Sequence, residues 1–137
     1  MALSVSLPTK NAIINQIIND LAGTYGTAGT AELKMYTGSQ PANADAAPSG
    51  TLLCTISPVS WAQCTGGTSA ISETVNGTAV TSGTTGWARF ERIGAAGTYR
   101  LDGDTGTGAA SVFVVNNDIF STAGAVVSLL TAQLYMA

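Results

Sequence analysis

Residues 87–104 constrain the fold most strongly, because they have the pattern of a β-hairpin. Apolar residues alternate with charged ones on both sides of a Gly94–Gly97 turn, which is typical of two half-buried antiparallel strands. Three of the five basic and three of the eight acidic side chains lie here. In a chain with so few charges, this concentration indicates either a structural ion-pair network or a recognition surface.

The rest of the chain mostly has the pattern of short strands. Alternating or apolar stretches predict strands at residues 31–37, 51–57, 59–64, 111–115 and 125–135, with long loops at 23–30 and 38–50. In the first, Leu33 and Met35 face one way, and Glu32, Lys34 and Tyr36 face the other. Asn76-Gly77, between residues 71–75 and 78–81, predicts a further hairpin. Eight to ten short strands favour a mainly β fold, an antiparallel β-sandwich or jelly roll.

One helix is expected near the N-terminus, with Thr9 as its N-cap and Gly23 as its stop. Helical spacing places five apolar residues on one face: Ile13, Ile14, Ile17, Ile18 and Leu21. A helix of about 12 residues is marginal alone, so this stripe must pack on its own domain or on a partner subunit. The length fits a single domain over residues 1–137, with an N-terminal arm and helix in 1–30 and the sandwich in 31–137.

Charged residues make up only 9% of the chain, and the net charge is −3. No basic face can follow a phosphate backbone, so we expect no nucleic-acid partner. A surface with so little charge has weak protection against self-association, which predicts that partners cover much of it and that the chain forms a homo-oligomer. Neither a signal peptide nor a membrane span is apparent, so we expect synthesis in a cytoplasm and no membrane partner.

The chain has no histidine, which removes the common catalytic triads and most zinc chemistry. We therefore predict no enzymatic activity and no cofactor. Asp102 and Asp104 begin like a calcium loop, but later ligand positions are missing; the alternative is a turn in which these side chains bond to backbone N–H groups. Cys54 and Cys64 are expected to be free buried thiols, given a reducing compartment.

Cross-strand ion pairs account for the clustered charges without a ligand. The predicted structural network has six members: Trp87, Arg89, Arg92, Arg100, Asp102 and Asp104. Tryptophans are more often core or interface anchors than ligand platforms, so Trp61 and Trp87 do not by themselves indicate glycan binding.

Two passages together carry a family resemblance. The first combines residues 33–47 (LKMYTGSQPANADAA) with 52–56 (LLCTI), and the second combines 87–92 (WARFER) with 101–107 (LDGDTGT) and 112–117 (VFVVNN). The chain resembles small virion-associated proteins of tailed bacteriophages and prophages, over most of its length from residue 31. The family is similar to β-sandwich capsid decoration, or cement, proteins. The Thr/Gly-rich tract at 65–86 and the long N-terminal segment depart from that pattern.

The resemblance implies a virion structural protein, assembled in a host bacterial cytoplasm, that binds and stabilises the shell of the major capsid protein. The apolar stripe of the helix and the Gln40-Pro41 loop are the candidate partner contacts. Alternatives are a head-to-tail, tail-fibre or baseplate component, and a glycan-binding sandwich module.

Overall fold

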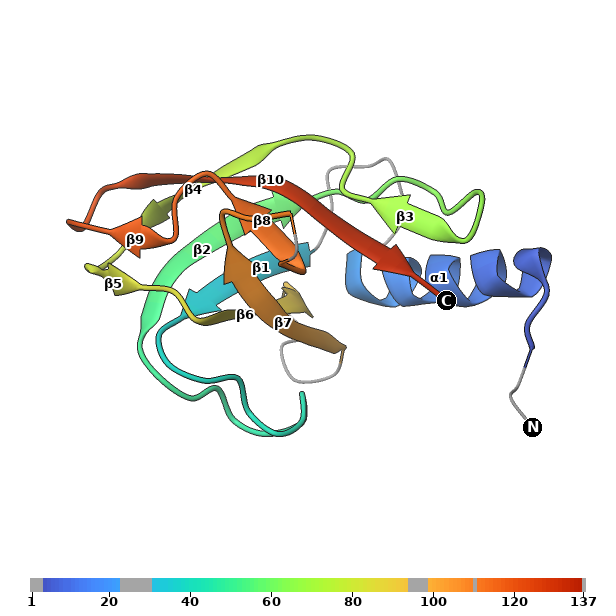
Figure 1. Cartoon of the computed structure of the whole chain (residues 1–137), viewed down its shortest axis with the longest axis horizontal. Coiled ribbons are helices and arrows are strands. Elements are labelled where there is room, and N and C mark those ends of the chain that lie inside the picture. Colours follow the sequence, from blue (N-terminus) through green and yellow to red (C-terminus); the bar gives the residue numbers. More distant parts are fainter. Residues whose placement is uncertain (1–3, 23–30, 94–98, 110, 137) are drawn as a thin grey trace.

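The computed structural model describes residues 4–22, 31–93, 99–109 and 111–136 (Figure 1). Its elements are α1 (Leu7–Ala22), β1 (Ala31–Tyr36), β2 (Leu52–Val59), β3 (Thr68–Ala70), β4 (Val75–Ala79), β5 (Gly83–Thr84), β6 (Trp87–Arg92), β7 (Arg100–Gly106), β8 (Phe113–Val115), β9 (Ile119–Phe120) and β10 (Val126–Tyr135). The predicted mainly β fold with one helix is confirmed.

The main sheet closes on itself. Its strands follow the order β4, β2, β1, β6, β7 and β8, and β10 pairs with both ends of this series. Leu129 of β10 pairs with Val75 of β4 on one edge and with Val115 of β8 on the other. The result is a seven-stranded barrel-like sheet, so the predicted two-layer sandwich or jelly roll is not what forms. β4 pairs with the first part of β10, and β3 pairs with its last residues. β5 and β9 form a separate two-stranded sheet.

Apolar side chains from the strands and the helix fill a single core. It includes Leu33 and Met35 of β1, Phe90 of β6 and Leu129 of β10, all fully buried. Trp61 packs edge-to-face on Phe90, with ring centroids 5.4 Å apart. The alternation predicted for β1 is confirmed, since Leu33 and Met35 are buried while Glu32 and Lys34 are half-buried on the opposite face.

Helix α1 begins two residues before the predicted cap. The Ser6 carbonyl accepts the first helical hydrogen bond, from the Lys10 N–H at 2.9 Å, and the Ser6 hydroxyl lies 2.9 Å from that of Thr9. Pro8 fits in the first turn because N–H groups there have no intrahelical partner. Thr9 is therefore not the N-cap. The expected stop at Gly23 lies outside the described residues.

The predicted Asn76-Gly77 hairpin is wrong, because both residues lie inside β4. Gly77 pairs with Ile56 of β2 and with Val127 of β10. A Cβ atom at position 77 would lie 2.6 Å from the Thr55 carbonyl oxygen and 2.9 Å from Cys54 Sγ. Glycine therefore serves the close approach of β2 and β4, and tertiary pairing overrides the local turn signal.

The predicted strand at residues 59–64 is also absent. β2 continues through Pro58 to Val59, and its register with β1 shifts across residues 56–59. Such a bulge accommodates proline because it leaves a residue unpaired. Between residues 60 and 64 the chain makes only an isolated bridge, from Trp61 to Ile71.

The hairpin of residues 87–104 is confirmed in its two strands. β6 and β7 are antiparallel, and Trp87 pairs with Asp104, Arg89 with Asp102, and Glu91 with Arg100. The predicted turn at 94–97 lies outside the described residues, as does the predicted loop at 23–30.

Candidate interaction surfaces

The outward face of β1, β6 and β7 carries a cross-strand charge network. Period-2 alternation and the observed register align its six ionic members in two rows across the three strands. One row holds Lys34, Arg89 and Asp102, and the other holds Glu32, Glu91 and Arg100. We call these six residues the charge network.

Arg89 and Asp102 form the most buried ion pair of the network. Arg89 Nε and Nη2 donate to the two Asp102 carboxylate oxygens at 2.7 and 2.8 Å, and the two side chains are 1% and 2% exposed. Hydrogen bonds to Asp102 raise the pKa of Arg89, although desolvation opposes this. The predicted cross-strand ion pairing is confirmed for this pair.

Two of the remaining ion pairs join Lys34 to both acids of the other row, and a third joins Arg100 to Glu91. Lys34 Nζ lies 2.8 Å from Glu32 Oε1 and also pairs with Glu91 Oε1. Burial lowers the pKa of Lys34, but the hydrogen bonds to Glu32 and Glu91 outweigh this effect and raise it. Arg100 Nε lies 4.0 Å from Glu91 Oε2. Sequence reasoning missed Glu32, Lys34 and Glu91, because their roles depend on the pairing of β1 with β6.

Two members of the predicted network behave differently. Arg92 lies on the opposite face of β6 from Arg89, and its Nη1 donates to the Asp20 carbonyl of α1 at 3.5 Å. Arg92 is therefore not part of the charge network. Asp104 is exposed and accepts a hydrogen bond from the Val112 N–H at 2.9 Å, rather than pairing with an arginine.

Trp87 lies beside the charge network and is fully buried. Its ring stacks on Tyr36 with centroids 4.7 Å apart, and Arg89 Cζ lies 5.5 Å from its ring centroid. Trp61 is 1% exposed. Neither tryptophan can offer a ring face to a sugar, so neither supports the alternative of a glycan-binding module.

The loop at residues 38–50 covers the charge network. Arg89 Nη1 donates to the Ala46 carbonyl at 2.9 Å, and Arg100 Nη1 donates to the Ala44 carbonyl at 3.0 Å. The arginines thus hold the loop against the barrel. Gln40 remains exposed and Pro41 half-buried, so these predicted partner contacts lie on an anchored loop.

The proposed calcium ligands do not converge on a site. Both oxygens of Asp102 are bonded to Arg89, and Asp104 bonds to a backbone N–H. Within the described residues, no group of three Asp, Glu, Cys or His side chains could hold a metal ion. The alternative in which Asp104 caps backbone N–H groups matches its hydrogen bond to Val112.

Helix α1 packs against its own barrel. Of the predicted contact stripe, Ile14, Ile18 and Leu21 are buried in the core, and Ile17 packs against it. Only Ile13, at 39% exposed, still faces solvent among these five. No helix in the described part of the chain is long and apolar enough to cross a membrane.

Two asparagines fix this packing, and sequence reasoning did not single them out for it. Asn15 Oδ1 accepts the Cys64 N–H at 2.8 Å, and Asn11 Oδ1 accepts the N–H groups of Gly67 at 2.8 Å and Gly66 at 3.3 Å. They satisfy backbone donors of the segment that leads to β3. Cys54 and Cys64 are free and buried, as predicted, and burial raises the pKa of Cys54 to about 11.

The other side of the barrel forms an uncharged wall, which we define as β2, β3, β4, β8 and β10. No residue of these five strands has a charged side chain. Val126, Leu130 and Tyr135 of β10 are nevertheless 60%, 46% and 72% exposed. The barrel therefore has one side with a covered charge network and another that presents apolar and hydroxyl groups without charge.

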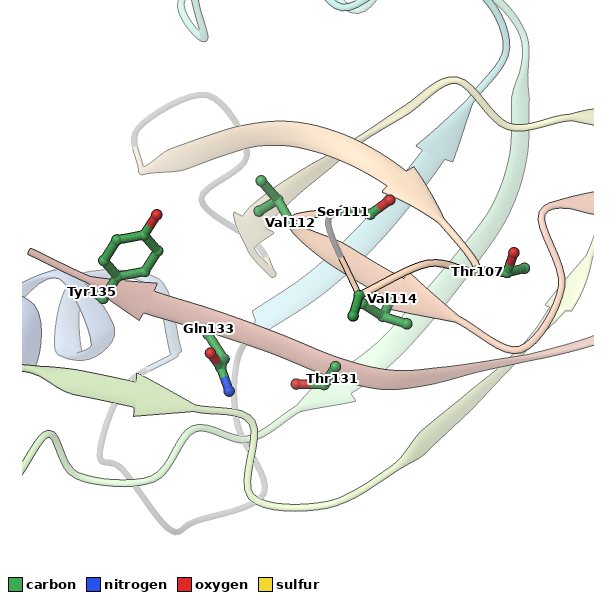
Figure 2. Close-up of a pocket in the computed structure, with 8 residues that line it drawn as sticks. Thr107, Ser111, Val112, Val114, Thr131, Gln133 and Tyr135 are labelled. Atoms are coloured by element: carbon green, nitrogen blue, oxygen red, sulfur yellow. The ribbon is translucent and has the colours of Figure 1, made fainter. Parts of the chain in front are cut away.

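A hollow of about 560 Å³ opens in the uncharged wall beside the last residues of β10. Figure 2 shows Thr131, Gln133 and Tyr135 projecting from β10, with Ser111 and Val112 across from them. Thr107, Ala109 and Val114 complete the lining, which contains no charged side chain.

Comparisons of this chain with protein-family models, with curated proteins and with solved structures found no match.

Proposed function

We propose that this chain is a non-enzymatic structural protein of a tailed-bacteriophage virion, and that it binds the outside of the capsid as a decoration protein. The observation that carries the proposal is the uncharged wall with exposed Val126, Leu130 and Tyr135 on a single strand. A protein working alone in solution is usually protected by surface charge, whereas a face buried against neighbouring subunits does not need it.

The distribution of charge supports the same proposal. Six of the thirteen charged side chains belong to the charge network, where they pair with one another under the loop at 38–50. They stabilise the fold and leave few charges to attract or repel a partner. The family resemblance of residues 33–56 and 87–117 points independently to a virion protein.

Capsid stabilisation then requires only binding. Each copy would bury part of its uncharged wall on major capsid subunits, and many modest contacts over a symmetric shell would add up by mass action. Gln40 and Pro41 offer a second contact, because the arginine-anchored loop holds them in place without ordering on binding.

Copy number per particle tests the location. Purified chain would be mixed with expanded capsids and sedimented, and the bound copies counted. A decoration protein gives hundreds of copies, whereas a dozen or fewer would assign the chain to the tail or baseplate. The absence of binding would contradict the capsid proposal.

A charge placed on the wall tests the surface. Val126→Lys puts an ammonium group on a side chain that is 60% exposed, so the fold should tolerate it while capsid binding falls at least tenfold. Asn19→Lys adds the same charge on an exposed position of α1 and should bind like the original chain. If both variants were folded and bound capsids equally well, the uncharged wall would not be part of the interface.

A further inference from the structure

Asn76-Gly77 is the one Asn-Gly pair in the sequence, and it marks a chemically reactive link in the backbone. In an unfolded chain, the backbone nitrogen that follows an asparagine can attack the side-chain amide. Glycine in the following position permits this most readily, because it has no side chain and a freely rotating backbone. The fold nevertheless requires this glycine, since a Cβ atom at position 77 would lie 2.6 Å from the Thr55 carbonyl oxygen.

The reaction of this pair is a deamidation. The Gly77 nitrogen gives its proton to solvent and bonds to Cγ of Asn76, while the Cγ–Nδ2 bond breaks and the amide nitrogen takes up a proton and leaves as ammonia. The product is a five-membered succinimide ring. Water then opens the ring at either carbonyl carbon. One opening gives aspartate, and the other gives isoaspartate, in which the main chain runs through Cβ and Cγ of residue 76.

The pairing of β4 directs the attacking nitrogen toward a neighbouring strand. The Ala79 N–H donates to the carbonyl of Ala125, directly before β10, at 2.8 Å. In an antiparallel pair, alternate residues direct their backbone groups to the same side. The Gly77 N–H therefore points toward β10, where Gly77 is paired with Val127. In the folded chain this nitrogen faces a paired strand and not solvent.

The extended backbone of Asn76 also keeps the reacting atoms apart. The ring closes only when ψ of Asn76 rotates the Gly77 nitrogen to the side of Cβ, whereas the ψ of a β-strand, about +135°, directs it away. That rotation would break the pairing of Gly77 with Ile56 of β2 and with Val127 of β10 together. The side chain of Asn76 is itself exposed, so strand pairing and not burial prevents the reaction.

Isoaspartate at position 76 would lengthen the backbone in the middle of β4. The register with β10 continues on both sides of this position, from Thr78 opposite Val126 to Val75 opposite Leu129. An additional main-chain carbon shifts one half of the strand relative to the other, so the two halves cannot both pair with β10. Because β4 lies between β2 and β10 in the closed sheet, the barrel would fail to close.

We propose that Asn76 is a site of spontaneous deamidation, which the folded barrel keeps unreactive and unfolding exposes, and that isoaspartate formed there prevents the chain from refolding. Unfolding of this chain then becomes irreversible with time. The proposal rests on the pairing of β4 and does not depend on a place in a virion.

Mass spectrometry after incubation at mildly alkaline pH tests the protection. Cleavage after glutamate gives the peptide 74–91, in which Asn76 is the only asparagine, so the mass change from amide to carboxyl reports this residue. The chain unfolded in urea should deamidate at least tenfold faster than the folded chain at the same pH and temperature. A synthetic peptide 74–91 should react like the unfolded chain with or without urea, which controls for the denaturant. Equal rates in the folded and the unfolded chain would overturn the proposal.

Refolding after the same incubation tests the consequence. The fraction that refolds when urea is removed, followed by tryptophan fluorescence, should fall in step with isoaspartate at position 76. Asn76→Thr has no side-chain amide to lose, and it lies at an exposed position opposite Ser128, so it should fold and keep its ability to refold. If Asn76→Thr lost refolding as fast as the original chain, deamidation of residue 76 would not be the cause.

Asn76→Asp separates the new charge from the altered backbone. This variant reproduces the aspartate product, with a carboxylate at an exposed position and an unchanged main chain. Before any incubation it should fold and refold like the original chain, because only isoaspartate lengthens β4. Failure of Asn76→Asp to fold would assign the loss of refolding to the charge and contradict the proposed mechanism.

Discussion

Arg89 of β6 and Asp102 of β7 form a buried two-pronged ion pair across the hairpin, with N···O distances of 2.7 and 2.8 Å. Arg89 also holds the covering loop through the Ala46 carbonyl and lies over the Trp87 ring. One side chain thus joins the barrel wall, the loop and the aromatic stack. Its position in the structure is that of a stabilising residue, not of a ligand-binding one.

Arg89→Ala should lower the free energy of unfolding by about 3–5 kcal/mol, because it leaves the carboxylate of Asp102 buried without a partner. Urea unfolding followed by tryptophan fluorescence measures the loss. Arg92→Ala is the matched control: Arg92 is half-buried with one long hydrogen bond of 3.5 Å, so its loss should stay below about 1 kcal/mol.

The same variant separates folding from binding. Arg89→Ala should impair folding at least as much as capsid binding. A well-folded Arg89→Ala variant that no longer bound capsids would make the charge network part of an interface and contradict its structural role.

Gly77→Ala should be destabilising, because its Cβ would come within 2.6–2.9 Å of the Thr55 carbonyl oxygen, Ile56 Cγ1 and Cys54 Sγ. Two paired strands must move apart to admit it, at a cost of about 1–3 kcal/mol. Gly108→Ala adds the same methyl group where no atom lies within 4 Å, so it should be close to neutral. Equal thermal unfolding of both variants would contradict the close packing of β2 and β4.

The elements that sequence predicted correctly are those whose two faces differ in polarity. In β1 and in the hairpin of β6 and β7, alternation alone separates core residues from the charge network. The same alternation could have excluded Arg92, since 89 and 92 differ by an odd number and must face opposite sides of one strand. Glu32 and Lys34 could not be assigned, because only the pairing of β1 with β6 brings them to the network.

Barrel closure could not be predicted from local pattern. It depends on β10 pairing with β4 on one edge and β8 on the other, and all three strands have similar uncharged sequences. The register shift between Leu129 and Thr131 likewise has no sequence signal. Asn76-Gly77 is the opposite case, in which a strong local signal loses to pairing on both sides of β4.

Asn11→Ala should destabilise the chain by about 1–3 kcal/mol, because the N–H groups of Gly66 and Gly67 lose their acceptor. The segment before β3 should loosen, which amide exchange at Gly67 would report. Asn19→Ala, on the exposed face of the same helix, should change stability by less than about 0.5 kcal/mol. If the two variants unfolded alike, the attachment of α1 would depend on its apolar stripe alone.

Alkaline pH should destabilise the chain through Cys54. Burial raises the pKa of this thiol from 9.0 to about 11, so the folded state keeps a proton that the unfolded state loses first. The contribution of Cys54 to the free energy of unfolding is therefore fully present below pH 9. It is lost as the pH rises to 11, which lowers the free energy of unfolding by about 2–3 kcal/mol. The pKa values of Lys34 and Tyr36 are also raised, which gives the same sign. Urea unfolding at pH 9 and pH 11 measures the decrease, and Cys54→Ala should show a smaller one. An equal decrease in the original chain and in Cys54→Ala would assign the effect to the other two groups.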